Sequence, residues 1–377
     1  MKHVFFSILF LMASTTLLAY DAEIDGIYYN LSDDEAEVTY NKVEGKNNMP
    51  APDYSGVIEI PCSVSYEGKT YSVTSIGMYS FYGCDALVSI NIPESVTSIG
   101  SHSFFGCRGL TSVTIPSGVT SIEDDTFYEC RNLKTANIPM GIKTIGGNAF
   151  RNCSSMTSIS LPNGVADIKN GAFEGCSSLA SISIPDGIPF IYDAVFLNCT
   201  SLTSVNIPES VTWIGISTFA GCSSLTAIDI PKGVTVICGN AFRDCSNLIS
   251  VTFSENLEKL GYNAFYGCKG LTSVTCKSQV PPSCSEPVFD GVDKQNCKLY
   301  VPKGCEEAYR AADLWKDFNI IEMGTGITSP LGEMREGAVI YDLCGRKIEN
   351  CQLSPINSQL KKGLYIVNGK KVAVKGH

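Results

Sequence analysis

Cysteine is the residue type whose spacing could most readily carry chemistry in this chain of 377 residues. Nine cysteines recur at a constant interval of 23 residues, at positions 84, 107, 130, 153, 176, 199, 222, 245 and 268. Thiolates act as nucleophiles and bind zinc, but zinc ligands commonly pair as CxxC, and the sequence contains no such pair. No catalytic constellation needs one residue type at nine equal intervals. A stack of similar structural units does, because each unit buries the same residue at the same place.

The constant interval predicts that these nine cysteines form one column inside a repeat structure. Side chains on stacked parallel units point the same way, so neighbouring thiols do not face each other as a disulfide requires. We interpret the nine as small apolar fillers of a buried column, with disulfides as the alternative. The sequence leaves open whether cysteines off this column pair with one another. Such pairs would lie within the cluster of Cys276, Cys284, Cys297 and Cys305, or between Cys344 and Cys351.

Acid–base chemistry has few residues to draw on. The sequence holds three histidines, one near the N-terminus, one at the C-terminal end, and His102 between them. Because its neighbour Cys107 belongs to the buried column, we interpret His102 as an exposed loop residue. The adjacent carboxylates Asp124 and Asp125 lie in a variable loop and are read as solvated. No nucleophile elbow, P-loop or metalloprotease motif is present, so we predict no enzymatic activity, no metal and no cofactor.

One unit, Leu110 to Cys130, shows which elements position the cysteines; it reads LTSVTIPSGVTSIEDDTFYEC. Val113 and Ile115 alternate with polar residues, which predicts a short strand. Pro116 ends that strand because proline cannot donate to a ladder. A second short extended segment follows. The segment before each cysteine is too short for a stable helix, so we expect a single helical or 3₁₀ turn there.

Phenylalanine follows the same period, which extends the argument from one unit to the whole array. It recurs at positions 81, 104, 127, 150, 173, 196, 219, 242 and 265. A single unit has no core of its own, whereas stacked units place phenylalanine on phenylalanine in one continuous apolar column. The sequence therefore predicts a mainly β repeat solenoid of nine 23-residue units with short helical turns.

The two ends of the chain depart from the period. The first residues combine a positive start, an apolar stretch too short to span a membrane, and a small residue suited to cleavage. Near the C-terminus, Asn368-Gly369 between two alternating segments indicates a hairpin. We divide the chain into a signal peptide (1–19), an N-terminal β cap (20–70), the solenoid (71–276), a C-terminal α+β cap (277–323), a linker (324–336) and a small β module (337–377). In the C-terminal cap we expect strands at Lys298–Val301 and Asn319–Glu322 and a helix at Glu306–Leu314.

Charge narrows the classes of partner. The net charge is −10, which argues against general binding of nucleic acid or anionic membranes. Seven acidic residues and no basic residue lie between positions 21 and 37, but the spacing of an EF-hand calcium loop is absent, and we interpret them as a solvated edge. No apolar run beyond the N-terminal leader approaches membrane length. We predict a protein without a transmembrane span, secreted or held at the outer cell surface.

The first extended segment presents two outward columns that are small, rich in hydroxyl groups and almost uncharged. One reads Ser89, Ser112, Thr135, Ser158, Ser181, Ser204, Ala227, Ser250 and Ser273, and the next Asn91, Thr114, Asn137, Ser160, Ser183, Asn206, Asp229, Thr252 and Thr275. Such a face is flat and lacks pocket-forming side chains. We interpret it as a soluble strand face, with recognition of a glycan or another extended partner as the alternative.

The second extended segment departs from its own pattern in three successive units. Its outward position is polar in most units, as in Ser98, Ser121, Thr144, Asp167 and Lys259. Stacking would bring the exceptions together on the exterior, and exposed aromatic clusters mark contact sites. The predicted partner-binding residues are Phe190, Tyr192, Trp213, Ile216 and Val236. The alternatives are cover by the C-terminal module, cover by a dimer partner, and no role.

Two units, IPESVTSIGSHSFFGCRGLTSVTIP and IPKGVTVICGNAFRDCSNLISV, resemble BspA-like leucine-rich repeats. The end segments DGIYYNL and KLYVPKGCEEAYRAADLWKDF are similar to those that flank such arrays. The resemblance implies a leucine-rich-repeat-like array on a bacterial surface. Members of this family occur on anaerobic gut and oral bacteria, with roles in adhesion to host matrix proteins such as fibronectin and fibrinogen and in co-aggregation. The tail, through IYDLCGRKI and LKKGLYIVNGKKVAVK, resembles a short sorting domain of type IX secretion.

Together these observations predict a non-enzymatic secreted or cell-surface scaffold that binds a protein partner. The resemblance implies an adhesin for a host extracellular matrix protein or for other cells. The alternative is a structural or glycan-binding surface module that uses the hydroxyl-rich strand face.

Overall fold

The computed structural model describes residues 20–41, 54–324, 340–342, 363–367 and 370–374. The chain divides into two units, Met1–Ile321 and Glu322–His377. The predicted signal peptide and nearly all of the predicted linker lie outside the described residues, as do Cys344 and Cys351.

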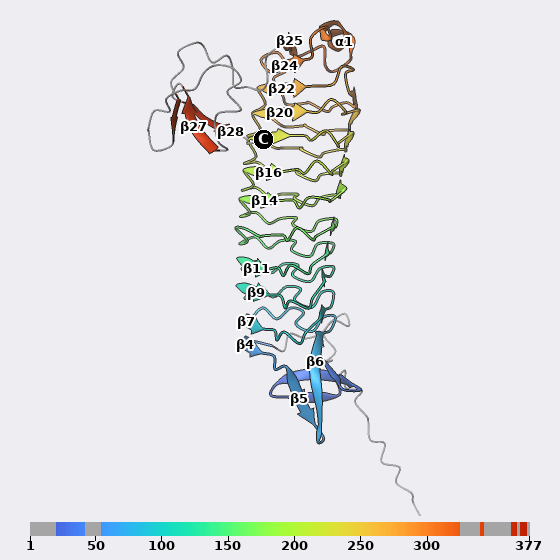
Figure 1. Ribbon diagram of the computed structural model, residues 1–377, viewed down its shortest axis with the longest axis vertical. Helices are drawn as coiled ribbons and strands as arrows, with labels where there is room; N and C mark the ends of the chain where they lie inside the picture. The colour runs from blue at the N-terminus through green and yellow to red at the C-terminus, as the bar shows by residue number, and fades with distance from the viewer. Residues whose placement is uncertain (1–19, 42–53, 325–339, 343–362, 368–369, 375–377) are drawn as a thin grey trace, which may run out of the picture. The chain divides into compact units, whose positions relative to one another are not determined.

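Each repeat of the first unit forms one coil with two short strands, and successive coils pair in parallel. Strand β9 (Ser112–Thr114) pairs with β11 (Thr135–Asn137) with Ser112 opposite Thr135, a shift of one repeat. Strand β10 (Ser121–Ile122) pairs in the same way with β12 (Thr144–Ile145). The coils stack along the long axis of this unit (Figure 1). The predicted fold class, a mainly β repeat solenoid, is therefore confirmed.

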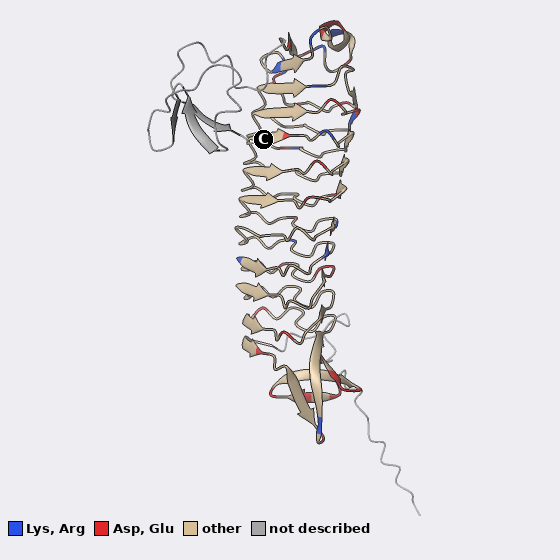
Figure 2. Ribbon diagram, in the orientation of Figure 1, with Lys and Arg blue, Asp and Glu red and all other residues tan. Residues whose placement is uncertain are grey.

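Two columns of strands run along the stack. The first column continues with β4 (Gly56–Glu59), β7 (Leu87–Asn91), β14 (Ser181–Ser183), β16 (Ser204–Asn206), β18 (Ala227–Asp229), β20 (Ser250–Phe253), β22 (Ser273–Cys276), β24 (Lys298–Val301) and β25 (Asn319–Glu322). The second continues with β8 (Ser98–Ile99), β13 (Asp167–Ile168), β15 (Phe190–Ile191), β17 (Trp213–Ile214), β19 (Val236–Ile237), β21 (Lys259–Leu260) and β23 (Ser283–Cys284). Charged residues lie mainly in the turns and at the ends of the stack, and the first column is almost free of them (Figure 2).

The turn before each cysteine is not the helical turn that we expected. The amide of Tyr128 donates to the carbonyl of Asp125 at 3.2 Å, and that of Cys130 to Phe127 at 3.1 Å. Between these bonds the backbone is left-handed at Asp125 (φ 56°) and Glu129 (φ 58°), which a right-handed helix does not allow. The alternate amides donate to the next coil instead, as Phe127 does to the carbonyl of Ala149 at 2.8 Å. Stacking therefore uses donors that a helix would keep within itself.

A column of stacked phenylalanine rings fills the centre of the coils. Neighbouring ring centroids are 5.0 to 5.7 Å apart, from Phe81 to Phe289. Phe289 extends this column beyond the nine predicted units, although one extra residue separates it from Phe265. Burial of each ring contributes about 1.5–3 kcal/mol relative to an exposed side chain, so the column is a main source of stability. Repeat stacking thus tolerates a one-residue insertion in the turn.

The cysteine column lies beside the rings, and its thiols are hydrogen-bonded between coils. The thiol of Cys176 donates to the carbonyl of Phe150 in the preceding coil at 3.1 Å. The same bond, at 3.0 to 3.2 Å, is made by Cys107, Cys130, Cys153, Cys199, Cys222, Cys245 and Cys268. Burial raises the pKa of the Cys176 thiol to about 12. These thiols act as buried fillers that also satisfy a backbone acceptor.

The pairing left open for the remaining cysteines is not observed in the described part of the chain. Cys276, Cys284, Cys297 and Cys305 are all free thiols. The hydroxyl of Tyr309 lies 3.1 Å from the sulfur of Cys276 and 2.8 Å from the carbonyl of Ser278. The sequence cluster therefore surrounds a buried tyrosine instead of forming a disulfide.

Aromatic side chains close both ends of the ring column. At the first end the ring of Tyr54 lies 4.6 Å from that of Phe81, and its hydroxyl donates to the carbonyl of Thr39 at 2.8 Å. At the other end Trp315 and Phe318 pack edge-on against Phe289, at 5.5 and 5.1 Å. Stacked cores need such covers because the terminal coil would otherwise expose its apolar face.

The N-terminal strands form one sheet that leads into the stack. Its order is β1-β2-β3-β6-β5, and β8 of the second column pairs with β6. Their bounds are β1 (Ala22–Ile24), β2 (Ile27–Ser32), β3 (Glu35–Thr39), β5 (Ser63–Tyr66) and β6 (Lys69–Ile76). The sequence did not predict β1 and β5, because each is completed only by pairing with a neighbour, β2 and β6 respectively.

The C-terminal elements of the first unit follow the sequence closely. Strands β24 and β25 have the predicted bounds. Helix α1 is shorter than predicted and spans Glu306–Ala311, since Ala312 is extended and Leu314 has a positive φ of 70°. Strand β24 pairs with β22 and adds a further coil to the first column.

The second unit contains a small antiparallel sheet. Its strands are β26 (Ile340–Asp342), β27 (Gly363–Val367) and β28 (Lys370–Val374), in that order. Val367 is opposite Lys370, which confirms the predicted hairpin; the turn residues Asn368 and Gly369 lie outside the described residues.

Candidate functional site

A five-stranded sheet of the second column carries the predicted contact residues. Phe190 is opposite Trp213, Trp213 opposite Val236, and Val236 opposite Lys259, so their side chains occupy one outward column. Successive side chains lie one coil apart, because each strand belongs to a different repeat.

Pro189 explains why this sheet begins at Phe190. At the equivalent position of other coils, an amide donates to the preceding coil. Ala166 donates to Lys143, and Thr212 to Pro189, each at 2.9 Å. Pro189 has no amide hydrogen, so the ladder is interrupted between β13 and β15. The ring column continues past this point, since Phe173 and Phe196 still stack at 5.7 Å.

Three rings meet on the outer face of this sheet. The ring of Phe190 lies 6.2 Å from Tyr192 and 6.3 Å from Trp213, and Tyr192 and Trp213 are 6.4 Å apart, all edge-to-face. Val236 follows Trp213 in register, and Ile216 lies in the turn after β17. We call these five residues the aromatic stripe. The structure thus brings the three predicted rings into mutual contact and places the two aliphatic residues on either side.

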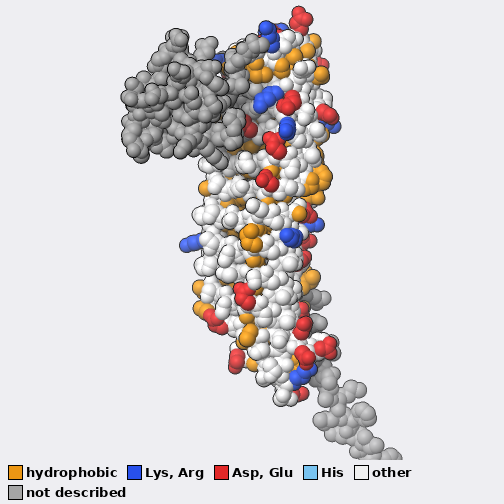
Figure 3. All heavy atoms as spheres, viewed as in Figure 1, with side chains coloured by type: hydrophobic (Ala, Val, Ile, Leu, Met, Phe, Trp, Pro, Cys, Tyr) orange, Lys and Arg blue, Asp and Glu red, His pale blue; other side chains and the backbone are white. Residues whose placement is uncertain are grey.

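The aromatic stripe is accessible and its central ring is held in place. Phe190 is 40% exposed and Ile216 49% exposed, whereas Tyr192, Trp213 and Val236 are half-buried. The indole nitrogen of Trp213 donates to the sulfur of Cys238 at 2.7 Å. A ring that is already oriented loses little conformational entropy when a partner binds. Elsewhere, hydrophobic side chains on the face in Figure 3 form small separate patches.

A second aromatic ladder lies on the turn face of the first coils, and the sequence reasoning missed it. The rings of Tyr82 and Phe105 stack at 4.8 Å, those of Phe105 and Tyr128 at 4.6 Å, and the guanidinium of Arg151 lies 5.6 Å from the Tyr128 ring. All of these residues directly follow the column phenylalanine. Reading that position down the repeats would have shown three aromatic residues in succession.

His102 is half-buried, which corrects the prediction of an exposed loop histidine. Its side chain is 29% exposed, its ring lies 4.9 Å from that of Tyr79, and its Nε2 is 3.4 Å from a carboxylate oxygen of Asp125. Burial raises the pKa of Asp125, and the facing His102 opposes that rise. Asp125 is therefore only partly solvated, whereas Asp124 is exposed as expected and accepts from the amide of Gly147 at 2.6 Å. Stacking of coils buries the histidine against its neighbours.

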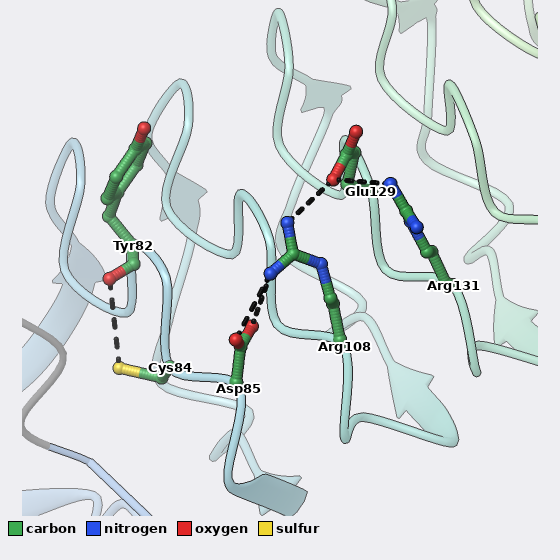
Figure 4. A network of polar contacts seen from close by, with 6 residues as sticks. All are labelled: Tyr82, Cys84, Asp85, Arg108, Glu129 and Arg131. Atoms are coloured by element: carbon green, nitrogen blue, oxygen red, sulfur yellow. Dashed lines mark hydrogen bonds and ion pairs between the residues drawn. The ribbon is translucent and has the colours of Figure 1, made fainter.

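A charged network joins three successive turns beside this ladder (Figure 4). Arg108 lies 3.1 Å from Asp85 and 2.8 Å from Glu129, and Arg131 lies 3.1 Å from Glu129. The hydrogen bond from Arg108 lowers the pKa of Glu129. Because Arg108 is 48% exposed, each pair contributes only about 0–1 kcal/mol. We interpret the network as a surface tie between coils.

Neither a metal site nor a membrane span is found where the structure is described. No group of three or more His, Cys, Asp or Glu side chains lies together in those residues. None of their helices has the length and apolar character needed to cross a bilayer.

The fold is a parallel β solenoid whose coils each match one 23-residue repeat. Its sequence matches the BspA type leucine rich repeat region over residues 74–202 and 166–291, more than half of the chain. The chain therefore belongs to the BspA-type leucine-rich repeat family, as the resemblance predicted.

Solved structures with similar coils come from several bacteria. A leucine-rich repeat protein from Bacteroides ovatus is 24% identical, over 81% of this chain and 100% of that one, with a TM-score of 0.49. The T. pallidum leucine rich repeat protein is 32% identical, over 53% of this chain and 87% of that one, with a TM-score of 0.46. A leucine rich cell surface protein from Faecalibacterium prausnitzii is 23% identical, over 69% and 94%, with a TM-score of 0.33. No curated protein matched the chain.

Proposed function

We propose that this protein is a non-enzymatic secreted or cell-surface scaffold that binds a protein partner through the aromatic stripe. In this role it would act as an adhesin for host matrix proteins or for other cells. The observation that carries the proposal is the contact of Phe190, Tyr192 and Trp213 on an outer face, in a column that is polar at Ser121, Thr144 and other units. Burial of these rings supplies no core packing between coils, so their apolar surface is available to a partner.

Export supports the same role. The N-terminal leader and the sorting-like tail suggest passage to the outside of the cell, and both are proposals from the sequence. We propose that the tail serves as a type IX sorting signal. Membership of the BspA-type repeat family agrees with a binding scaffold, since a stack of coils without a catalytic cluster offers extended surfaces.

A glycan-binding module is the second candidate, and the outer face of the first strand column favours it. Ser181 is opposite Ser204, and Ser183 is opposite Asn206, with all four side chains exposed. These groups form rows of donors and acceptors at the spacing of the coils. Such a face would hold an extended polar chain by hydrogen bonds.

The test is direct binding of the mature chain to immobilised fibronectin, fibrinogen and other matrix proteins. The variant Phe190→Ser with Trp213→Ser should fold as the parent does and lose saturable binding. A matched control, Val88→Ser with Met140→Ser, removes two exposed apolar side chains elsewhere and should leave binding unchanged. Binding that survives loss of the aromatic stripe but is competed by glycans would favour the strand face instead.

A further inference from the structure

The outward column of the second segment has a self-complementary order that extends beyond the aromatic stripe. Over five successive coils it reads Asp167, Phe190, Trp213, Val236 and Lys259. One acidic residue, three apolar residues and one basic residue follow at equal spacing, with Trp213 at the centre. The acid stands two coils before Trp213 and the base two coils after it.

A twofold axis through the Trp213 coil, along the strand direction, would match this column to itself. Rotation by half a turn about that axis places coil −2 of one copy against coil +2 of the other. Asp167 then faces Lys259 of the second copy twice, and Trp213 faces Trp213. Isologous contacts require this kind of self-complementary surface. With the two solenoids parallel instead, Asp167 would face Asp167 and Lys259 would face Lys259, which is unfavourable.

We propose that a partner of the aromatic stripe is a second copy of this chain, bound face to face with the two solenoids antiparallel. This inference rests on the proposed function, because it uses the same contact site and names its partner. The contact joins copies displayed on different cells or particles as readily as copies in solution, since the two chains run in opposite directions.

The two charged residues are available for such a contact. Lys259 is exposed and forms no ion pair with another described residue. The Asp167 side chain is 32% exposed and lies 3.6 Å from Lys169, a distance at which a surface pair is weak. Both groups therefore give up little when they meet a charge on the second copy.

Side chains beside the column also suit the antiparallel arrangement. Tyr192 stands one coil before Trp213 and Cys238 one coil after it, so each tyrosine faces a cysteine of the second copy. Sulfur beside an aromatic edge is a favourable contact. The two Cys238 residues are two coils apart, about 9.6 Å, which exceeds the span of a disulfide. Association is therefore expected to persist in the presence of a reductant.

The length of the column sets the expected strength. Five coils span about 19 Å, so the contact buries less than the roughly 1,200 Å² of stable protein interfaces. We expect weak, reversible association of single chains, in the micromolar to millimolar range. Many copies on one surface would convert this into firm attachment through avidity.

The decisive experiment reverses the charges and mixes the products. Sedimentation equilibrium of the mature chain over a range of concentrations should show a monomer–dimer equilibrium. Asp167→Lys alone and Lys259→Asp alone should each weaken it by at least about tenfold, because every dimer then holds two like-charge contacts. An equimolar mixture of the two variants should restore dimers, since each like-charged column meets its opposite. The double reversal in one chain should also dimerise, and the control Lys134→Asp should not alter the equilibrium.

A chain that stays monomeric at the highest soluble concentration would overturn the inference, as would single reversals that the mixture does not rescue. Binding to immobilised matrix proteins is measured on the same samples. A monomer that binds a matrix protein through Phe190 and Trp213 contradicts the second copy but leaves the proposed function intact. Dimers rescued by mixing, without binding to any matrix protein, support the inference and remove the matrix-protein role.

Discussion

The cysteine column and the aromatic stripe occupy fixed positions of the same repeat but differ in what holds them. The cysteines keep their identity through nine coils, lie fully inside, and bond to the preceding coil. The aromatic stripe breaks the pattern of its own column for three coils only and points outward. Inside the stack each coil sees the same neighbours, so the same residue recurs. Outside it the neighbour is solvent or a partner, so a departure from the pattern marks a site rather than a core.

The largest expected effect is on the inner side of this comparison. Phe173→Ala removes a fully buried ring from the stacked column and should lower the free energy of unfolding by about 3–5 kcal/mol. Phe190→Ala, in the aromatic stripe, should change it by less than about 1 kcal/mol because that ring is partly exposed. Urea unfolding of both variants checks the contrast. Equal losses would show that the stripe is part of the core.

Alkaline pH should destabilise the cysteine column. The thiol pKa is about 12 for Cys176, Cys222 and Cys268 in the folded protein, against an ordinary 9.0. Above pH 9 the unfolded chain releases protons that the folded chain keeps. Stability is therefore complete below pH 9 and falls as the pH rises toward 12, by up to about 1.4 kcal/mol per pH unit for each thiol.

Urea unfolding at about pH 8 and about pH 10 measures this loss. Cys176→Ala removes one of the buried thiols and should make the pH dependence shallower. A native protein whose column thiols react with a thiol reagent as fast as the exposed Cys62 would contradict their burial.

The aromatic stripe should separate binding from stability. Phe190→Ser with Trp213→Ser should abolish partner binding while the free energy of unfolding changes by no more than about 1 kcal/mol. Circular dichroism and urea unfolding measure the second quantity beside the binding assay. A loss of several kcal/mol would mean that these rings support the coils and that lost binding is indirect.

The smallest effect is expected at the charged network of Figure 4. Arg108→Ala removes the contacts to Asp85 and Glu129 and should cost less than about 1 kcal/mol, since all three pairs are near solvent. The difference in melting temperature from the parent should shrink further at high ionic strength. A large and salt-independent loss would indicate that packing of the Arg108 side chain, and not its charge, holds the turns together.

The sequence by itself determined the columns of this protein. A 23-residue period with one cysteine and one phenylalanine per unit can bury its apolar residues only by stacking, so the solenoid, its ring column and the neighbours of Trp213 follow from counting. The strands β24 and β25 were also predicted, because their alternation is local. The proline that interrupts the second strand column is visible in the sequence as well, since Pro189 has no amide to donate.

Tertiary structure alone decided how each turn is built and what lies beside it. Whether the amides near Phe127 close a helix or bond to the next coil depends on a neighbour 23 residues away, and the stack takes them. His102 is half-buried for the same reason, since Tyr79 and Asp125 reach it only from adjacent coils. Strands β1 and β5 exist because β2 and β6 pair with them. Sequence patterns report which residues a coil must bury, whereas contacts between coils determine the conformation of everything that joins them.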